Sequence, residues 1–330
     1  MRIQRGVSIV ATIAMVRQAT PPSGGLVFVS NEAAHSISVI NAGTGRVETT
    51  IPVRSRPRGI QATRDGRFVF AALSEDTLIR GAKRRDGIAV IDVSARRVVR
   101  ELHSGTDPEQ FAISGDGKTI YASNEDAGTV SAIDVHSGAV SATSVVGIEP
   151  EGVAVSPDGR WVYVTAETSN SVSVLDVAKR TVVDNLLVDA RPRGVAFSPD
   201  SRRAYVTAEI GGSVSMIDTK TREILVTQAL DGGESKPVGV VVSPDGRRVY
   251  VACGRSNAIA VLDAETLKPV GRVAVGRRPW GVTLSSDGTL LYVANGLSNT
   301  VSIVDPKTLA VTTNVTVGLK PWGVAFVRPR

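Results

Sequence analysis

A sequence unit of about 42 residues repeats through almost the whole chain. Each unit contains an apolar run of the type SVSVLD, and the residues that end these runs are Asn41, Asp92, Asp134, Asp176, Asp218, Asp263 and Asp305. Successive end residues are 51, 42, 42, 42, 45 and 42 positions apart. A period in this range is typical of the four-stranded blades of a β-propeller. The repeat therefore predicts an all-β protein with seven blades.

Each unit holds four short runs that have the length and composition of β-strands. In one unit they are GVAFS, AYVTA, SVSMID and EILVTQAL, with turn residues between them. Asp-Gly or Asp-Ser joins the first run to the second, because an Asp side chain bonds to the local backbone and Gly accepts a positive φ. The recurring SPDG sequence thus predicts a tight turn and not a catalytic motif.

The chain starts and stops out of phase with this unit. It begins at Leu26 with a run that corresponds to a second strand, and it ends with a first strand at residues 323–327. We therefore expect the C-terminal strand to complete the N-terminal blade, which closes the ring and removes two open sheet edges. Residues 26–330 are predicted to form one seven-bladed domain with four antiparallel strands per blade.

Residues 1–25 have the layout of a secretory signal and linker. They have a basic start, an apolar run from Gly6 to Val16 and a Pro/Gly-rich end, although Arg17 stands where small residues should precede a cleavage site. The apolar run is too short to span a bilayer. We predict export to the periplasm or the medium; a frayed tail or a misplaced start codon is the alternative. The net charge of +6 falls to +3 without the three arginines of this segment, which argues against nucleic acid as a partner.

The repeat also carries a family resemblance. Over residues 26–327, the Y-V-[TA]-[NAE] strand and the P-x-G-V-x-x-S-P-D-G unit resemble the repeats of YVTN-family β-propellers. The runs SNEAAHSISVI, SGTDPEQF, VDNLLVDARPRG, AEIGGSVS and KPWGV are similar to the exported propeller proteins associated with PQQ-dependent alcohol catabolism in bacteria. This resemblance implies a periplasmic setting beside quinoprotein dehydrogenases and c-type cytochromes. It implies no established reaction.

One face of the predicted ring collects the loops before the first strands and the ends of the second strands, around the mouth of the central channel. The candidate binding residues on this face are Arg56, Arg58, Glu109, Glu151, Arg191, Arg193, Lys236, Arg278, Trp280, Lys320 and Trp322. The loops at Asp107 and Glu149 make an acidic sector and the others are basic, which suits an oriented partner. The alternative is that Arg and Glu of adjacent blades pair and stiffen the ring.

The two longer units place their extra residues on this same face, in LSEDTLIRGAKRRDG and near DGGESKP. Insertions on one face of a repeat fold often mark its binding side. Arg80, Lys83, Arg84 and Arg85 of the first insertion could reach an acidic partner, and a solvated loop is the alternative.

Two tryptophans occupy equivalent positions in successive units. Trp280 and Trp322 follow the proline of R-P-W-G and K-P-W-G, where most other units carry charged residues. We therefore expect a ledge of two exposed indoles beside Arg278 and Lys320, suited to an anionic planar ligand or to a partner's hot spot. Packing of the rings is the alternative.

Candidate catalytic residues are few. The three histidines are scattered and there is no G-x-S-x-G motif, which argues against haem or zinc ligation and against serine hydrolysis. The ends of second strands offer carboxylates at equivalent positions, Glu32, Glu125, Glu167 and Glu209. In a lactonase-like hydrolase these could hold a divalent cation that polarises a lactone carbonyl.

The sequence favours a non-catalytic binding or scaffold propeller that is accessory to a quinoprotein oxidation system. We expect a monomer without a cofactor or a membrane span, and a partner such as a periplasmic quinoprotein dehydrogenase or a cytochrome c; a small anionic ligand also fits the face. The alternative is a metal-assisted lactonase-like hydrolase. A lower alternative is single-stranded nucleic-acid binding by the tryptophans and flanking cations, against which the nearby carboxylates argue.

Overall fold

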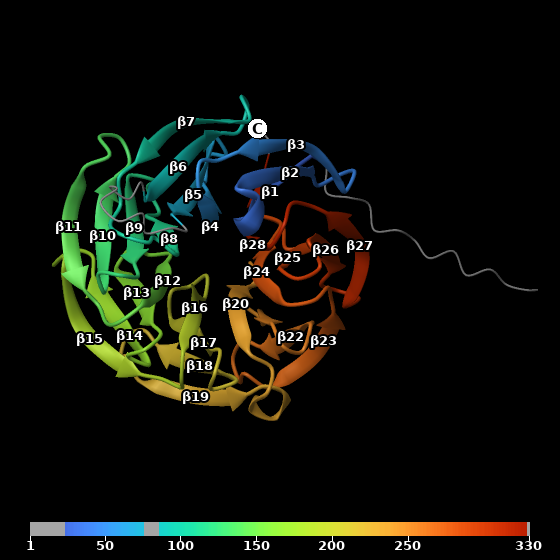
Figure 1. Ribbon diagram of the computed structural model, residues 1–330. Coiled ribbons are helices and arrows are strands. Elements are labelled where there is room, and N and C mark those ends of the chain that lie inside the picture. Colours follow the sequence, from blue (N-terminus) through green and yellow to red (C-terminus); the bar gives the residue numbers. More distant parts are fainter. Residues whose placement is uncertain (1–23, 76–85, 329–330) are drawn as a thin grey trace, which may run out of the picture.

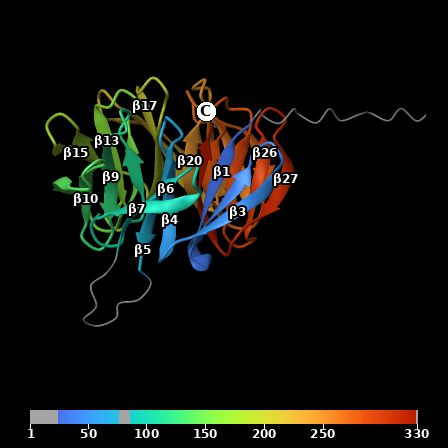
Figure 2. The same cartoon turned by 90° about the horizontal axis from the view of Figure 1, so that it is seen from above.

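The computed structural model describes residues 24–75 and 86–328, and within them every sheet is a four-stranded antiparallel blade. Seven such blades surround a central channel (Figure 1). Seen from the side, the ring is a disc with loops on its two faces (Figure 2). The predicted seven-bladed, all-β propeller is confirmed. No helix in the described ranges is long and apolar enough to cross a membrane.

The blades are numbered here from the first strand after the N-terminal segment. Blade 1 consists of β28 (Pro321–Val327), β1 (Leu26–Asn31), β2 (Ser36–Asn41) and β3 (Arg46–Pro52). Blade 2 consists of β4 (Arg56–Ala62), β5 (Phe68–Ser74), β6 (Gly87–Asp92) and β7 (Arg97–Leu102). Blade 3 consists of β8 (Phe111–Ile113), β9 (Thr119–Asn124), β10 (Thr129–Asp134) and β11 (Val140–Val145).

The remaining four blades follow in chain order. Blade 4 consists of β12 (Pro150–Val155), β13 (Trp161–Ala166), β14 (Ser171–Asp176) and β15 (Thr181–Leu187). Blade 5 consists of β16 (Pro192–Phe197), β17 (Arg203–Ala208), β18 (Ser213–Asp218) and β19 (Ile224–Ala229). Blade 6 consists of β20 (Pro237–Val242), β21 (Arg248–Cys253), β22 (Ala258–Asp263) and β23 (Pro269–Ala274). Blade 7 consists of β24 (Pro279–Leu284), β25 (Leu291–Asn295), β26 (Thr300–Asp305) and β27 (Ala310–Thr316).

The ring closes where the sequence phase predicts. Strand β28 pairs antiparallel with β1, with Leu26 opposite Val327 and Val29 opposite Val324. The C-terminal strand thereby covers the edge of β1 and gives blade 1 its innermost strand.

Adjacent blades are joined through the glycine of each P-x-G sequence. A Cβ atom on Gly152 would lie 2.0 Å from the carbonyl oxygen of Arg193 in the next blade. The hydroxyl of Thr165 bridges the same two chains, because it donates to the Arg193 carbonyl oxygen at 2.8 Å and accepts from the Gly152 N–H at 2.8 Å. The recurring P-x-G and Y-V-T sequences are therefore parts of one inter-blade joint.

Because the two chains approach so closely at this joint, we expect one added methyl group at the glycine to destabilise the fold strongly. We expect Gly152→Ala to lower the free energy of unfolding by about 3 kcal/mol, because the backbone of the next blade must move to admit the Cβ atom. The control is Gly254→Ala, whose Cβ atom would meet its nearest neighbour at 3.4 Å. Urea denaturation of the two variants measures the difference, and equal midpoints would disprove the joint.

The SPDG sequences form turns on the opposite side of the blades from the P-x-G loops. In blade 5 the Ser198 hydroxyl donates to Asp200 at 2.6 Å and accepts from the Arg203 N–H at 3.0 Å. The same Ser–Asp hydrogen bond recurs at Ser156, Ser243 and Ser285. The Asp side chains are thus hydrogen-bonded within their own turns, which is the behaviour of a structural motif.

Candidate functional site

An unusual backbone turn brings charged side chains to the mouth of the channel. In six blades the residue before the proline that opens the first-strand segment, P-x-G in five of them and P-E-Q in blade 3, has a left-handed φ between 50° and 60°. Residues before proline normally adopt extended conformations. These residues are Asp107, Glu149, Arg191, Lys236, Arg278 and Lys320. Hydrogen bonds from backbone N–H groups hold this turn in place. The N–H groups of Arg278 and Lys320, for example, donate to asparagine side chains at 2.9 Å.

Arg193 is the centre of an ion-pair network in blades 4 and 5. Its guanidinium contacts Glu151 and Glu209, each at 2.9 Å, and also Glu167. Its side chain is only 8% exposed. Burial lowers the pKa of Arg193, but the three carboxylates outweigh that effect and hold the pKa above its usual value. One buried guanidinium thus contacts three buried carboxyl groups.

Two further arginines complete this network. Arg191 contacts Glu167 at 2.6 Å and Glu209 at 3.5 Å, and Arg278 contacts Glu209 at 3.6 Å. The three arginines thus contact the carboxyl groups of Glu151, Glu167 and Glu209 between them.

A second network lies in blades 1 to 3. Arg58 contacts Glu32 at 3.3 Å and also Glu109, and Arg56 contacts Glu32 at 3.6 Å and Asp107 at 3.4 Å. The arginines of blade 2 therefore reach both neighbouring blades. The acidic and basic loops that the sequence separates into sectors are, in this part of the ring, partners of each other.

A cavity of about 330 Å³ opens at the mouth between these networks. Its walls are Glu32, Arg58, Glu125, Glu151, Glu167, Arg191, Arg193, Arg278, Trp280, Gly296, Leu297, Lys320, Pro321 and Trp322. Lys320 is exposed and has no ion-pair partner among the described residues. The cavity thus brings buried carboxyl groups, cations and two aromatic rings within reach of one small molecule. We call it the mouth cavity.

The predicted ledge of two exposed indoles is wrong. Trp322 is only 6% exposed and Trp280 is half-buried, with ring centroids 6.0 Å apart and planes tilted by 44°. The reason is that this position points inward in several blades: Glu109, Glu151 and Arg193 stand there and are 0%, 3% and 7% exposed. Their charges are satisfied by each other and not by water, so a charged residue type here does not indicate exposure.

Trp280 still borders the mouth cavity, and cations flank its ring. The guanidinium carbons of Arg278 and Arg193 lie 4.7 Å and 5.4 Å from the ring centroid. Such contacts hold the arginines in place beside an apolar wall. Trp322 separates the mouth cavity from the channel below, because it lines both.

The four glutamates at the ends of second strands do not form one cluster. Glu32, Glu167 and Glu209 are each paired with arginine. Glu125 instead lies beside Asp107 and Glu109, and one oxygen of each of these three carboxylates lies within 4.8 Å of the others. Burial, followed by the charges of Glu151 and Asp107, raises the pKa of Glu125 to about 7. Of the four glutamates that the repeat indicates, only Glu125 thus lies in a cluster of carboxylates that could hold a cation among the described residues.

Glu151 and Glu167 form a carboxyl–carboxyl pair within the Arg193 network. Burial raises the pKa of Glu167, and the charge of Glu151 and a hydrogen bond with it add to the effect. Two carboxyl groups share a hydrogen bond only when one is protonated. The protonated form of Glu167 is thus favoured above the pH at which a glutamate normally ionises.

The raised pKa predicts how stability depends on pH. The native state keeps the Glu167 proton above the ordinary glutamate value of 4.5, where the unfolded chain has lost it. This contribution is fully present below that value and is lost as the pH rises through the raised native pKa. We expect the parent to lose about 1 kcal/mol more than Glu167→Gln between pH 5 and pH 9 in urea denaturation. Parallel pH profiles would contradict the shared proton.

The other predicted binding residues lie apart from the mouth cavity. Lys236 lines a shallow depression of about 360 Å³ over blades 6 and 7, together with Gly254, Arg255, Asn257, Arg277, Arg278 and Leu297. We call it the basic depression. Arg80, Lys83, Arg84 and Arg85 lie outside the described residues.

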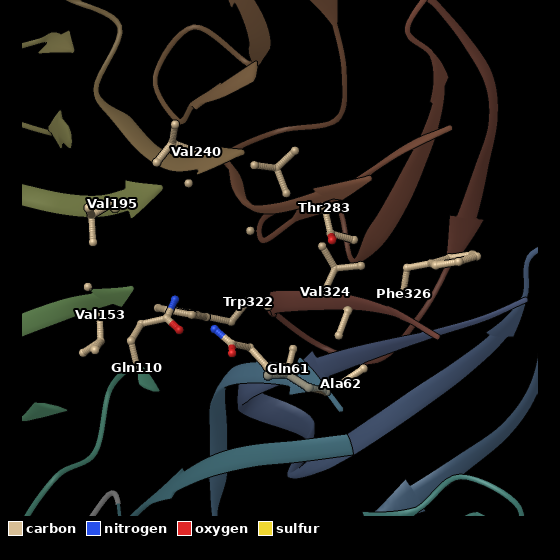
Figure 3. A pocket seen from close by; sticks show the side chains of 18 residues that line it. Gln61, Ala62, Gln110, Val153, Val195, Val240, Thr283, Trp322, Val324 and Phe326 are labelled. Atoms are coloured by element: carbon tan, nitrogen blue, oxygen red, sulfur yellow. The ribbon is translucent and has the colours of Figure 1, made fainter. Parts of the chain in front are cut away.

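The channel itself contains polar groups that the sequence interpretation missed. It encloses about 410 Å³, and its walls are mostly glycines and aliphatic side chains. Gln61, Gln110 and Trp322 gather at one side of it (Figure 3). Gln110 stands where the other blades have the glycine of P-x-G, so the sequence DPEQF in place of P-x-G was the available signal.

Comparisons with known proteins place the chain among the propellers. A family model described as a seven-bladed lactonase propeller matches residues 185–317, and one described as a YNCE-like propeller matches residues 70–198. Each match covers less than half of the chain, and no curated protein matches. The first match contains Arg191, Arg193, Glu209, Arg278 and Trp280 of the mouth cavity or its network.

Solved structures agree with the fold. A putative 6-phosphogluconolactonase from Bacteroides uniformis is 19% identical with a TM-score of 0.78, covering 93% of this chain and 100% of that one. The periplasmic gluconolactonase of Pseudomonas aeruginosa is 23% identical with a TM-score of 0.75, covering 92% and 99%. A chain of Kuenenia stuttgartiensis hydrazine synthase is 24% identical with a TM-score of 0.77, covering 91% and 99%. The chain is a seven-bladed β-propeller, similar in part to the lactonase and YNCE-like propeller families.

Proposed function

We propose that the protein is a lactonase-like hydrolase whose substrate binds in the mouth cavity. The observation that carries the proposal is the pair of buried carboxyl groups Glu151 and Glu167, of which Glu167 has a raised pKa. The pair is set beside Arg191 in a cavity that a small molecule can enter. The partial match to the lactonase family model and the lactonase names of two structural neighbours support the same reading. A purely structural ion-pair network does not require a cavity of this size.

The residues present can supply each proton movement of lactone hydrolysis. Water forms a new bond to the carbonyl carbon, and Glu151 accepts the proton that water loses. The bond from the carbonyl carbon to the ring oxygen then breaks, and Glu167 donates its proton to that oxygen. A proton transfer from Glu151 to Glu167 restores the pair. Each lactone molecule and one water molecule thus yield one molecule of hydroxy acid.

The cations of the mouth cavity define the substrate class. Arg191 lies beside the pair and is 45% exposed, so it can contact the carbonyl oxygen as negative charge develops there. Lys320 and Arg278 lie on the rim and favour a lactone that carries an anionic group. Trp280 offers an apolar face against which a ring can stack.

Lactone hydrolysis by purified protein tests the proposal. We expect proton release from one or more members of a panel of sugar lactones and carboxylated lactones, with Arg191→Ala raising KM and lowering kcat. The control is Arg255→Ala, which removes an arginine that is 62% exposed, pairs with Glu234 and does not line the mouth cavity. Hydrolysis rates equal to those of the uncatalysed reaction for every lactone of the panel would contradict the proposal.

A binding role remains a second proposal, and the basic depression is the observation that favours it. Lys236 has no ion-pair partner among the described residues, and three arginines surround it. An acidic surface on a quinoprotein dehydrogenase or a cytochrome c would complement this charge. Co-purification from a periplasmic extract, repeated with Lys236→Glu, tests the role; a partner retained equally by both proteins does not use this surface.

Export also stays a proposal, because residues 1–23 lie outside the described part of the chain. N-terminal sequencing of the protein from its native host decides the question. We expect a mature chain that starts shortly before Leu26. A chain that starts at Met1 in the cytoplasm would place the protein elsewhere.

A further inference from the structure

We propose that Asp107, Glu109 and Glu125 bind a divalent cation of the Ca²⁺ type at the edge of the mouth cavity. The three carboxylates each offer an oxygen within 4.8 Å of the others. Asp107 and Glu109 belong to the loop before β8, and Glu125 directly follows β9. The inference concerns cation binding alone and holds whether or not the protein hydrolyses lactones.

A buried oxygen without a donor points to the cation. Glu109 is fully buried, at 0% exposure. Its Oε2 atom contacts Arg58, but its Oε1 atom is buried and has no hydrogen-bond partner among the described residues. A buried carboxylate oxygen that lacks a partner is costly in a folded protein, and coordination of a cation removes that cost.

The donor set selects the type of cation. All three ligands are hard carboxylate oxygens, without His or Cys, which disfavours zinc and copper. Ca²⁺ binds oxygens at about 2.3–2.6 Å, so ligands on opposite sides of the ion lie roughly 5 Å apart, close to the spread found here. Mg²⁺ requires a stricter octahedron and retains its waters. Ca²⁺ therefore fits this loop-borne site best.

Cation binding would strengthen the connection between β9 and the loop before the short strand β8. Strand β8 has only three residues, whereas the first strands of the other blades have six or seven. Backbone hydrogen bonds from the Glu125 N–H to the Asp107 carbonyl oxygen, at 3.2 Å, and from the Ser123 N–H to the Gln110 carbonyl oxygen, at 3.0 Å, join the loop to the end of β9. A cation shared by the loop and Glu125 would tie them together and fix Glu125 in the wall of the mouth cavity.

Calorimetric titration of the chelator-dialysed full-length protein with CaCl₂ tests the inference. We expect saturable binding to one site in the parent, and at least a tenfold loss of affinity in Glu125→Gln, which is half-buried and has no arginine partner among the described residues. Glu109→Gln should lose as much, and if it fails to fold, Glu125→Gln alone decides. Equal concentrations of MgCl₂ should bind more weakly.

The matched control is Glu149→Gln. Glu149 is an exposed carboxylate on the same face that accepts a hydrogen bond from Thr168 and lies outside the cluster. The affinity of the Glu149→Gln variant for Ca²⁺ should stay within twofold of that of the parent. Absence of saturable binding up to about 10 mM, beyond the range of weak extracellular sites, overturns the inference, as does unchanged affinity in Glu125→Gln. Binding without lactonase activity leaves it intact and removes only the proposed hydrolysis.

Discussion

Deletion of residues 323–330 is expected to abolish the stable fold. The deletion removes most of β28, including Val324, Ala325 and Val327, whose exposed fractions are 7%, 5% and 2%. It also leaves the edge of β1 unpaired. Burial of three such side chains contributes about 5 kcal/mol, comparable with the whole stability of many domains. An open edge strand also templates association with other chains. We therefore expect aggregation, or a melting temperature at least 10 °C lower.

The control for this deletion removes only residues 329–330, which follow β28. Differential scanning calorimetry and size-exclusion chromatography compare the two proteins. An unchanged melting curve and a monomeric elution volume for the longer deletion would show that β28 does not hold the ring closed.

Replacement of Arg193 by methionine is expected to cost about 3–5 kcal/mol, the range observed when one partner of a buried ion pair is lost. The change keeps much of the side-chain volume but leaves Glu151, Glu167 and Glu209 buried without their shared cation. Acidification should reduce the deficit, because protonated carboxyls tolerate burial better than carboxylates. The deficit is therefore expected to be larger at pH 8 than at pH 5.5.

Urea denaturation at the two pH values measures this effect. Arg255→Met is the matched control, because the ion pair of Arg255 with Glu234 is exposed and should contribute less than about 1 kcal/mol. A cost for Arg193→Met as small as that of the control would contradict the central role of Arg193. So would a deficit that grows on acidification.

The sequence predicts the fold closely because the repeat is a local property. Each unit carries its own turn signals and strand pattern, so seven units and the phase of the termini suffice to place β28 beside β1. The face on which the P-x-G loops meet also follows from strand direction. That face does contain the mouth cavity.

The partners within the mouth could not be predicted in the same way. Ion pairs such as Arg193–Glu151 join the side chains of neighbouring blades, and which side chains pair depends on their reach and orientation. The sequence predicts an exposed Trp322 because charged residues stand at the equivalent positions of other blades. Two of these residues, Glu109 and Arg193, are in fact buried beside groups of opposite charge, so the position does not require contact with water. Repeat equivalence likewise grouped Glu125 with the wrong glutamates. Its actual neighbours, Asp107 and Glu109, come from its own blade.

The kinetics of Glu167→Gln test the central claim, that the mouth cavity is a hydrolytic site, most directly. Gln matches the shape and neutrality of a protonated Glu167, so the ion-pair network and the unfolding midpoint at pH 7 should stay close to those of the parent. It cannot donate the proton to the leaving ring oxygen, and general acid catalysis typically accounts for about 10²–10⁴ in rate. With the lactone that the parent hydrolyses best, the account predicts at least a hundredfold loss of kcat/KM for the folded variant. A folded variant that hydrolyses this lactone as fast as the parent would contradict it.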